Sequence, residues 1–155
     1  MSKILSCLSD AARLTAGRCE SRAQKPAALV VDDDPDVPPL VERALARFDI
    51  FSDSVDDGAK AIARLRALTY DLVILDLGMP EPNGFEVLQA LKKESRLRRI
   101  PVLVLTGDNS NDALARSFGC GADDLVVKPF NASELGLRAY RLLHPLANRH
   151  ALKGN

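Results

Sequence analysis

The sequence alternates short strand-like segments, most of them apolar runs, with longer segments whose apolar residues recur at helical spacing. The predicted strands cover residues 27–31, 50–55, 71–75, 101–105 and 125–127, and the second of them has a mixed pattern. The segments with helical periodicity cover residues 38–48, 59–68, 85–93, 111–118 and 131–143. Such alternation implies a parallel sheet, because each right-handed crossover lays a helix on one of its faces. We therefore predict an α/β fold, a doubly wound sheet of five parallel strands with helices on both faces.

Composition narrows the class of protein. The chain has 155 residues, and 21 Lys and Arg balance 21 Asp and Glu, so a nucleic-acid partner, which would need a basic excess or patch, is not expected. The three cysteines, Cys7, Cys19 and Cys120, form no CxxC pair and suggest no disulfide framework, which favours a reducing cytoplasmic compartment. No apolar run approaches membrane-spanning length, so we expect no membrane partner.

The chain divides into three parts. Residues 1–26 form an extension with some apolar residues at helical spacing, and a frayed peripheral segment is favoured over a docking arm. Residues 27–144 form the globular domain, and residues 145–155 form a polar tail that begins at Pro145. The two histidines, His144 and His150, are interpreted as surface residues, because no carboxylate or cysteine spacing makes them a metal pair.

Polar residues fall where the predicted strands end. Asp32 and Asp33 end the first strand, Asp76 ends the third, Thr106 ends the fourth and Lys128 ends the fifth. Carboxyl ends of parallel strands share one rim, where ligands bind in open α/β sheets. Three carboxylates gathered there would repel one another, and either a bound Mg²⁺ or a raised pKa on one acid would relieve the repulsion.

These residues together suit a phosphoryl group. A metal, the Lys128 ammonium and the Thr106 hydroxyl would make a pocket for a dianionic phosphoryl group, and Asp76 would be the nucleophile. Phosphoryl transfer depends mainly on position and charge, so little else is required. Taken singly, each residue also fits a structural role: Asp76 as a loop cap, Lys128 as a surface lysine and Thr106 as a strand-end hydroxyl.

Four motifs in this order resemble the receiver domain of a two-component response regulator. They are Leu29-Val30-Val31-Asp32-Asp33-Asp34, Asp71-Leu-Val-Ile-Leu-Asp76-Leu-Gly-Met-Pro80 with Gly84, Val104-Leu-Thr106-Gly, and Ala122-Asp-Asp-Leu-Val-Val-Lys128-Pro129-Phe130. The resemblance covers about residues 27–144. It implies a flavodoxin-like (βα)5 sheet with strand order 2-1-3-4-5.

The resemblance also implies a role for each acidic residue. Asp76 would be the phosphoacceptor. Asp33 would ligate Mg²⁺ directly, Asp32 would act largely through a bound water, and Gly78 would offer its backbone carbonyl to the metal. The phosphate would come from a phosphohistidine on a histidine kinase or a histidine phosphotransfer protein.

On the same resemblance, Thr106 and Lys128 would each bind a phosphoryl oxygen, with the Lys128-Pro129 peptide cis. The domain would be a signalling domain rather than an enzyme, although it would assist its own phosphorylation and dephosphorylation. A shift of Thr106 would rearrange the fourth helix and fifth strand and present a surface to a downstream target protein. Because only a dozen residues follow Leu143, we expect a stand-alone receiver whose output is a protein contact.

The chain departs from the family pattern at a few positions. Leu125 stands where an aromatic switch residue is frequent, and Pro82-Asn83-Gly84 replaces the usual Met-Asp-Gly. Gly78 and Asp108 occupy positions that tune the phosphate lifetime in the family.

Two other functions remain as alternatives. Asp32 and Asp34 fit the DxD opening of a haloacid-dehalogenase-like phosphatase, with Asp32 as nucleophile and Asp34 as acid/base, although the following Pro35-Asp36 and the short chain argue against it. A receiver-fold scaffold that is not phosphorylated is the other. An EF-hand interpretation of the same acidic run fails, because Val37 replaces the required glycine.

Overall fold

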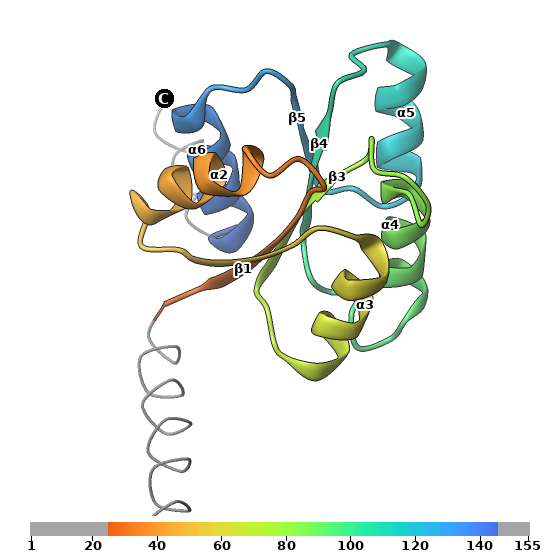
Figure 1. Cartoon of the computed structure of the whole chain (residues 1–155), viewed down its shortest axis with the longest axis horizontal. Helices are drawn as coiled ribbons and strands as arrows, with labels where there is room; N and C mark the ends of the chain where they lie inside the picture. Colours follow the sequence, from red (N-terminus) through yellow and green to blue (C-terminus); the bar gives the residue numbers. More distant parts are fainter. Residues whose placement is uncertain (1–24, 146–155) are drawn as a thin grey trace, which may run out of the picture.

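The computed structural model describes residues 25–145, and the predictions for the N-terminal extension and for nearly all of the C-terminal tail lie outside this range. Five strands alternate with five helices (Figure 1). In chain order they are β1 (Ala27–Val31), α2 (Val37–Ala46), β2 (Phe51–Val55), α3 (Gly58–Ala67), β3 (Leu72–Asp76), α4 (Gly84–Lys93), β4 (Val102–Thr106), α5 (Asn111–Gly119), β5 (Asp124–Val127) and α6 (Ala132–Leu143).

The sheet confirms the predicted doubly wound topology. All four strand pairings are parallel, and the strand order is β2-β1-β3-β4-β5. Helices α2 and α6 cover one face, and α3, α4 and α5 cover the other (Figure 1). None of the described helices is long and apolar enough to cross a bilayer.

Burial explains why the central runs form strands. Every residue of β1, β3 and β4 is buried, as expected for strands covered on both faces. Alternate residues enter different cores: Leu72 and Ile74 pack under α2 and α6, whereas Val73 and Leu75 pack under the other three helices. Strand β2 lies at the edge of the sheet and is mostly exposed, which accounts for its mixed sequence.

Two strand ends concern the site. Asp76 and Thr106 are the last residues of β3 and β4, which confirms that each of them ends its strand. The Leu77 amide donates to the Leu105 carbonyl at 3.0 Å, and the Lys128 amide donates to the Thr106 carbonyl at 2.7 Å. Sheet hydrogen bonds therefore fix the backbone that carries both side chains.

Side-chain caps begin most helices at the carboxyl end of the sheet. Asp57, Asn83, Ser110 and Asn131 each accept a hydrogen bond from a backbone amide of the first turn. Asn83 and Glu86 form a reciprocal capping box at the start of α4. These caps fix where each loop at this end of the sheet enters its helix.

Candidate functional site

The three acidic residues meet where β1 and β3 end side by side. Val31 is the register partner of Leu75, so Asp32 and Asp76 emerge next to each other. One carboxylate oxygen from each of Asp32, Asp33 and Asp76 lies within 4.8 Å of the other two. Asp32 and Asp76 are buried, at 2% and 5% relative exposure, whereas Asp33 is exposed. The structure thus brings together the carboxylates that the strand-end pattern predicts at one rim.

Lys128 joins this cluster from the end of β5. Its Nζ lies 2.8 Å from Asp32 Oδ2 and 3.4 Å from Asp76 Oδ1. Its backbone amide donates to the Thr106 carbonyl at 2.7 Å, which ties the residue to the end of β4. The Lys128-Pro129 peptide is cis, as the resemblance implied. The ammonium therefore bridges two buried carboxylates that come from different strands.

Burial and repulsion set the charge state of this cluster. Burial raises the pKa of Asp32, the charge of Asp76 adds to the rise, and hydrogen bonds from Lys128 and the Asp34 amide oppose it. Burial lowers the pKa of Lys128, but the hydrogen bond to Asp32 and the charges of Asp76 and Asp32 outweigh burial and leave this pKa raised. Lys128 thus stays a cation among carboxylates whose negative charge it only partly offsets.

Thr106 is held by its own turn. The residue is 5% exposed, its Oγ1 donates to the Asp108 carbonyl at 3.2 Å, and it accepts from the Asp108 amide at 3.0 Å. Asp108 Oδ1 in turn accepts from the Ser110 amide at 2.8 Å, directly before α5. A new anionic partner for the Thr106 hydroxyl would therefore compete with contacts that shape the start of α5.

The loop after β3 fixes the Asp76 carboxylate. Gly78 is exposed, and its amide donates to Asp76 Oδ1 at 3.0 Å. Among the described residues, no hydrogen-bond donor reaches Asp76 Oδ2, which leaves that oxygen available for chemistry. The role of the Gly78 carbonyl toward a metal stays a prediction.

Sequence reasoning missed the reason why Gly84 belongs to the site. A Cβ at this position would overlap the Asp76 carbonyl and the Leu77 Cα, which are backbone atoms and cannot rotate away. The first turn of α4 therefore packs directly on the chain that carries Asp76. A glycine that opens a helix just after a strand-end carboxylate was the available signal.

Asp34 does not take part in the cluster. It is exposed, and its Oδ1 accepts from the Asp36 amide at 3.0 Å. Its own amide donates to Asp32 Oδ1 at 2.9 Å while Lys128 occupies Oδ2, so both oxygens of Asp32 are engaged. A phosphatase that used Asp32 as nucleophile and Asp34 as acid/base is not favoured by this arrangement.

The donor set fits a hard divalent cation. Mg²⁺ prefers carboxylate oxygens and keeps several of its waters, which suits two buried carboxylates and one exposed carboxylate at an open rim. The one ammonium of Lys128 is shared by Asp32 and Asp76 and offsets only part of the negative charge of the three carboxylates. These residues therefore match the chemistry of a magnesium site.

Comparison with known proteins decides the family. Residues 28–139 match the family model described as the response regulator receiver domain. The chain belongs to the response regulator receiver domain family. Members of this family are signalling domains of two-component systems, and they generally bind Mg²⁺ at an acidic cluster.

Two curated relatives illustrate how far the similarity extends. The chain is 36% identical over 131 residues to a protein of a Synechocystis strain called the DNA-binding dual master transcriptional regulator RpaA, covering 81% of this chain and 54% of the relative. It is 35% identical over 115 residues to the transcriptional regulatory protein ResD of Bacillus subtilis, covering 74% of this chain and 47% of the relative. The receiver thus spans about half the length of either relative.

Solved structures show the same fold. The receiver domain of the Francisella response regulator 1452 matches with a TM-score of 0.73 at 27% identity, covering 78% of this chain and 98% of that one. The chemotaxis response regulator CheY4 of Vibrio cholerae matches with a TM-score of 0.72 at 29% identity, covering 76% and 98%. The phosphorylated cyanobacterial phytochrome response regulator RcpA matches with a TM-score of 0.65 at 31% identity, covering 74% and 89%.

Proposed function

We propose that this receiver accepts a phosphoryl group on Asp76 from a phosphohistidine of a histidine kinase or histidine phosphotransfer protein. The observation that carries the proposal is the Lys128 ammonium, which lies between the buried carboxylates of Asp32 and Asp76. A bridging cation at this place lets an incoming phosphoryl dianion approach a nucleophile that is itself negatively charged.

The transfer itself needs one bond made and one broken. A carboxylate oxygen of Asp76 attacks phosphorus while the bond between phosphorus and the donor's imidazole nitrogen breaks, and the leaving imidazole keeps the electron pair and takes up a proton. The Lys128 ammonium exchanges its contact with the Asp76 carboxylate for a contact with a phosphoryl oxygen. The Thr106 hydroxyl donates to another phosphoryl oxygen. Because sheet hydrogen bonds fix the backbone at Asp76, the nucleophile needs little rearrangement at the moment of reaction.

Asp32, Asp33 and Asp76, with the Gly78 carbonyl, would hold Mg²⁺. When bound, the ion would neutralise charge on the phosphoryl oxygens and on the acidic cluster. Asp33 is the exposed member and is suited to direct contact with a hydrated ion, whereas Asp32 already accepts two hydrogen bonds and would act through water. We assign these roles as part of the proposal.

The output would run from Thr106 to the surface formed by α5, β5 and α6. A phosphoryl oxygen that draws the Thr106 hydroxyl away from Asp108 would release the turn before α5. Leu125 of β5 is buried in the core, so the switch would operate without an aromatic residue at that position. Phe118 of α5 and Leu137 of α6 are each about half exposed and offer apolar contacts to a target protein.

The test is phosphorylation by acetyl phosphate with Mg²⁺, followed by intact-mass measurement. We expect the native protein to gain the mass of one phosphoryl group, and Asp76→Asn to gain none. Phosphate transfer from a purified phosphohistidine donor should show the same dependence on residue 76.

Asp34→Asn is the matched control, because Asp34 is an exposed neighbour that does not enter the cluster. It should label like the native protein. Labelling that survives Asp76→Asn would overturn the proposal and favour Asp32 as nucleophile. No labelling of the native protein by either donor would favour a receiver-fold scaffold.

A further inference from the structure

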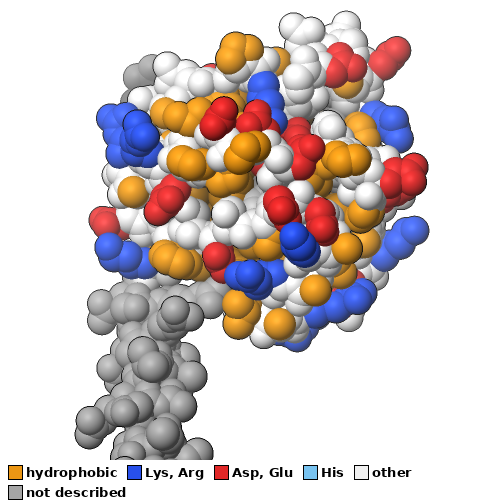
Figure 2. Space-filling view, in the orientation of Figure 1, with side chains coloured by type: hydrophobic (Ala, Val, Ile, Leu, Met, Phe, Trp, Pro, Cys, Tyr) orange, Lys and Arg blue, Asp and Glu red, His pale blue; other side chains and the backbone are white. Residues whose placement is uncertain are grey.

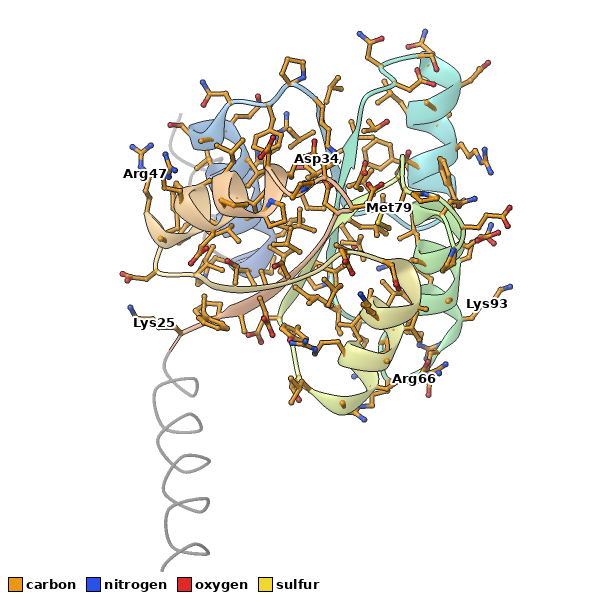
Figure 3. All side chains as sticks on the ribbon, viewed as in Figure 1. Lys25, Asp34, Arg47, Arg66, Met79 and Lys93 are labelled. Carbon is orange, nitrogen blue, oxygen red and sulfur yellow. The ribbon has the colours of Figure 1, made fainter. Side chains whose placement is uncertain are left out.

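Basic side chains concentrate at the end of the sheet that lies opposite Asp76. Acidic residues outnumber basic ones in the described part of the chain, yet Arg66, Lys93, Arg96, Arg98 and Arg99 all lie where α3 and α4 end. We call these five residues the arginine patch. Figure 2 shows Lys and Arg gathering over this part of the molecule, and Figure 3 shows Arg66 and Lys93 at the opposite end from Asp34.

The patch is built on an ordered connector between α4 and β4. Leu97 is 2% exposed and anchors the connector in the core, while the arginines on either side of it are exposed. Arg96 Nη1 donates to the Arg66 carbonyl at 3.2 Å, and the partly buried Lys92 donates to the Arg98 carbonyl at 3.5 Å. These contacts hold side chains from two separate segments on one surface.

The patch carries charge that the domain does not neutralise. Arg66 Nε pairs with Glu94 Oε2 at 3.2 Å, and its side chain is 62% exposed. Within residues 25–145, no carboxylate lies within 4.0 Å of the charged groups of the other four members. Basic residues in the last turn of a helix complement its dipole, which accounts for Arg66 and Lys93. It does not account for Arg96, Arg98 and Arg99, which lie beyond α4.

We propose that the arginine patch binds an acidic peptide segment of a partner protein. Four of its five members are arginines, whose planar guanidinium groups can bind carboxylates with two parallel hydrogen bonds. A single-stranded nucleic acid would need aromatic side chains for stacking, and the patch has none. A membrane surface would favour several apolar side chains for insertion, but of the leucines beside the patch Leu97 is buried and Leu68 offers one side chain, 39% exposed. The acidic excess of the remaining surface would also repel an extended polyanion more than a short peptide.

This binding does not depend on the proposed phosphorylation. Strand β3 separates the patch from Asp76, and its four residue steps from Leu72 to Asp76 span about 13 Å. That is longer than the Debye length of about 8 Å at physiological salt, so a charge added to Asp76 has little direct effect on the patch. A partner held at the amino end of the sheet would leave the carboxyl end free for a phosphoryl donor.

The experiment measures fluorescence anisotropy of a short labelled polyglutamate peptide titrated with the whole chain. We expect binding at low salt that weakens at physiological salt, where it is equal for the native protein and Asp76→Asn. The triple variant Arg96→Gln/Arg98→Gln/Arg99→Gln should bind about tenfold more weakly. The double variant Arg98→Gln/Arg99→Gln, which spares the Arg96 contact with Arg66, should show the same direction of change with unaltered folding.

The matched control removes the same charge elsewhere. Arg43 on α2, Arg47 at the C-cap of α2 and Arg141 on α6 are exposed, and these helices cover the other face of the sheet. The variant Arg43→Gln/Arg47→Gln/Arg141→Gln should bind like the native protein. Absence of peptide binding at low salt, or an equal loss in both triple variants, would overturn the proposal. Tighter binding of duplex DNA or of vesicles containing phosphatidylserine would also overturn it and assign the patch to that partner class.

Discussion

The two ends of the sheet treat charge in opposite ways. At the carboxyl end, Asp32 and Asp76 are buried and share the Lys128 ammonium over distances of 2.8 and 3.4 Å. At the amino end, the arginine patch is exposed to solvent, and Arg66 is its one member with an ion pair to a described residue. A net charge of zero for the whole chain conceals this separation.

The difference in burial between the two ends indicates which end can carry out chemistry and which can only bind a partner. A buried charge needs a partner at a fixed position, so removing one member of the cluster is costly and its effect is not additive. Exposed charges are screened by water and salt, so each contributes little and the contributions nearly add. The first arrangement can orient a reacting group, whereas the second can only attract an oppositely charged surface.

The largest expected effect on folding comes from the backbone under the carboxyl end. Gly84→Ala places a methyl group on the Asp76 and Leu77 backbone and should lower the free energy of unfolding by about 3 kcal/mol. The same substitution should also reduce phosphorylation of Asp76, because it displaces the backbone that carries this residue. Gly119→Ala is the control, because a Cβ there meets no atom within 4 Å. Urea unfolding that gave equal stability for both variants would remove the claim that α4 packs on the site.

Mg²⁺ should stabilise the carboxyl end next most strongly. A metal concentration 100-fold above its dissociation constant raises the free energy of unfolding by about 2.7 kcal/mol, and chelation should reverse the gain. Asp33→Asn should lose most of this gain without destabilising the metal-free protein, because Asp33 is exposed. Asp34→Asn should keep it. Thermal unfolding with and without Mg²⁺ measures both, and a gain that persists in Asp33→Asn would place the metal elsewhere.

Substitutions of Lys128 and Lys60 compare the loss of an ion pair with buried carboxylates with the loss of an exposed ion pair. Lys128→Met leaves Asp32 and Asp76 without their cation and should lower the free energy of unfolding by about 2 kcal/mol in metal-free buffer. Lys60→Met removes the exposed pair with Asp56 and should leave stability unchanged. Added Mg²⁺ should restore part of the loss in the first variant. Equal stability of the two variants by urea unfolding would contradict the distinction between the two kinds of charge.

The smallest expected effect on the free energy of unfolding comes from Tyr70, a buried residue outside the phosphoryl site. Tyr70 is 2% exposed and donates to Asp53 Oδ2 at 2.8 Å, and Asp53 also pairs with Arg64. Burial, followed by the hydrogen bond to Asp53, raises the pKa of Tyr70 above its ordinary value of 10.0. The folded state therefore favours the neutral phenol, and this stability is complete below pH 10.0 and is lost as pH rises through the raised pKa.

Tyr70→Phe should consequently cost about 1 kcal/mol near neutral pH and flatten the alkaline fall in stability. Urea unfolding over an alkaline pH series checks this prediction. Tyr140→Phe removes the hydroxyl of the exposed tyrosine of α6 and should show the same decrease in stability at alkaline pH as the native protein. An unchanged fall in Tyr70→Phe would show that other groups cause it.

Much of the fold could be predicted because its signals are local. Apolar runs, caps such as Asn83 and Asn131, and prolines at the start of α2 specify where elements begin and end within one or two residues. The same reasoning places Asp32, Asp76 and Lys128 at one rim, since every strand of a parallel sheet ends on the same side. The alternation of side chains along each strand likewise follows from the sequence.

Only the tertiary structure decided the distances between charges. Lys128 and Asp32 are 96 positions apart, and Arg96 and Arg66 are 30 apart, so no local preference relates them. The overlap that requires glycine at position 84 arises from α4 lying on β3. Local sequence sets the conformation of neighbouring residues, whereas the order of strands and the packing of helices on them depend on burying the whole core at once. The chemistry of the site and the segregation of charge both follow from that second step.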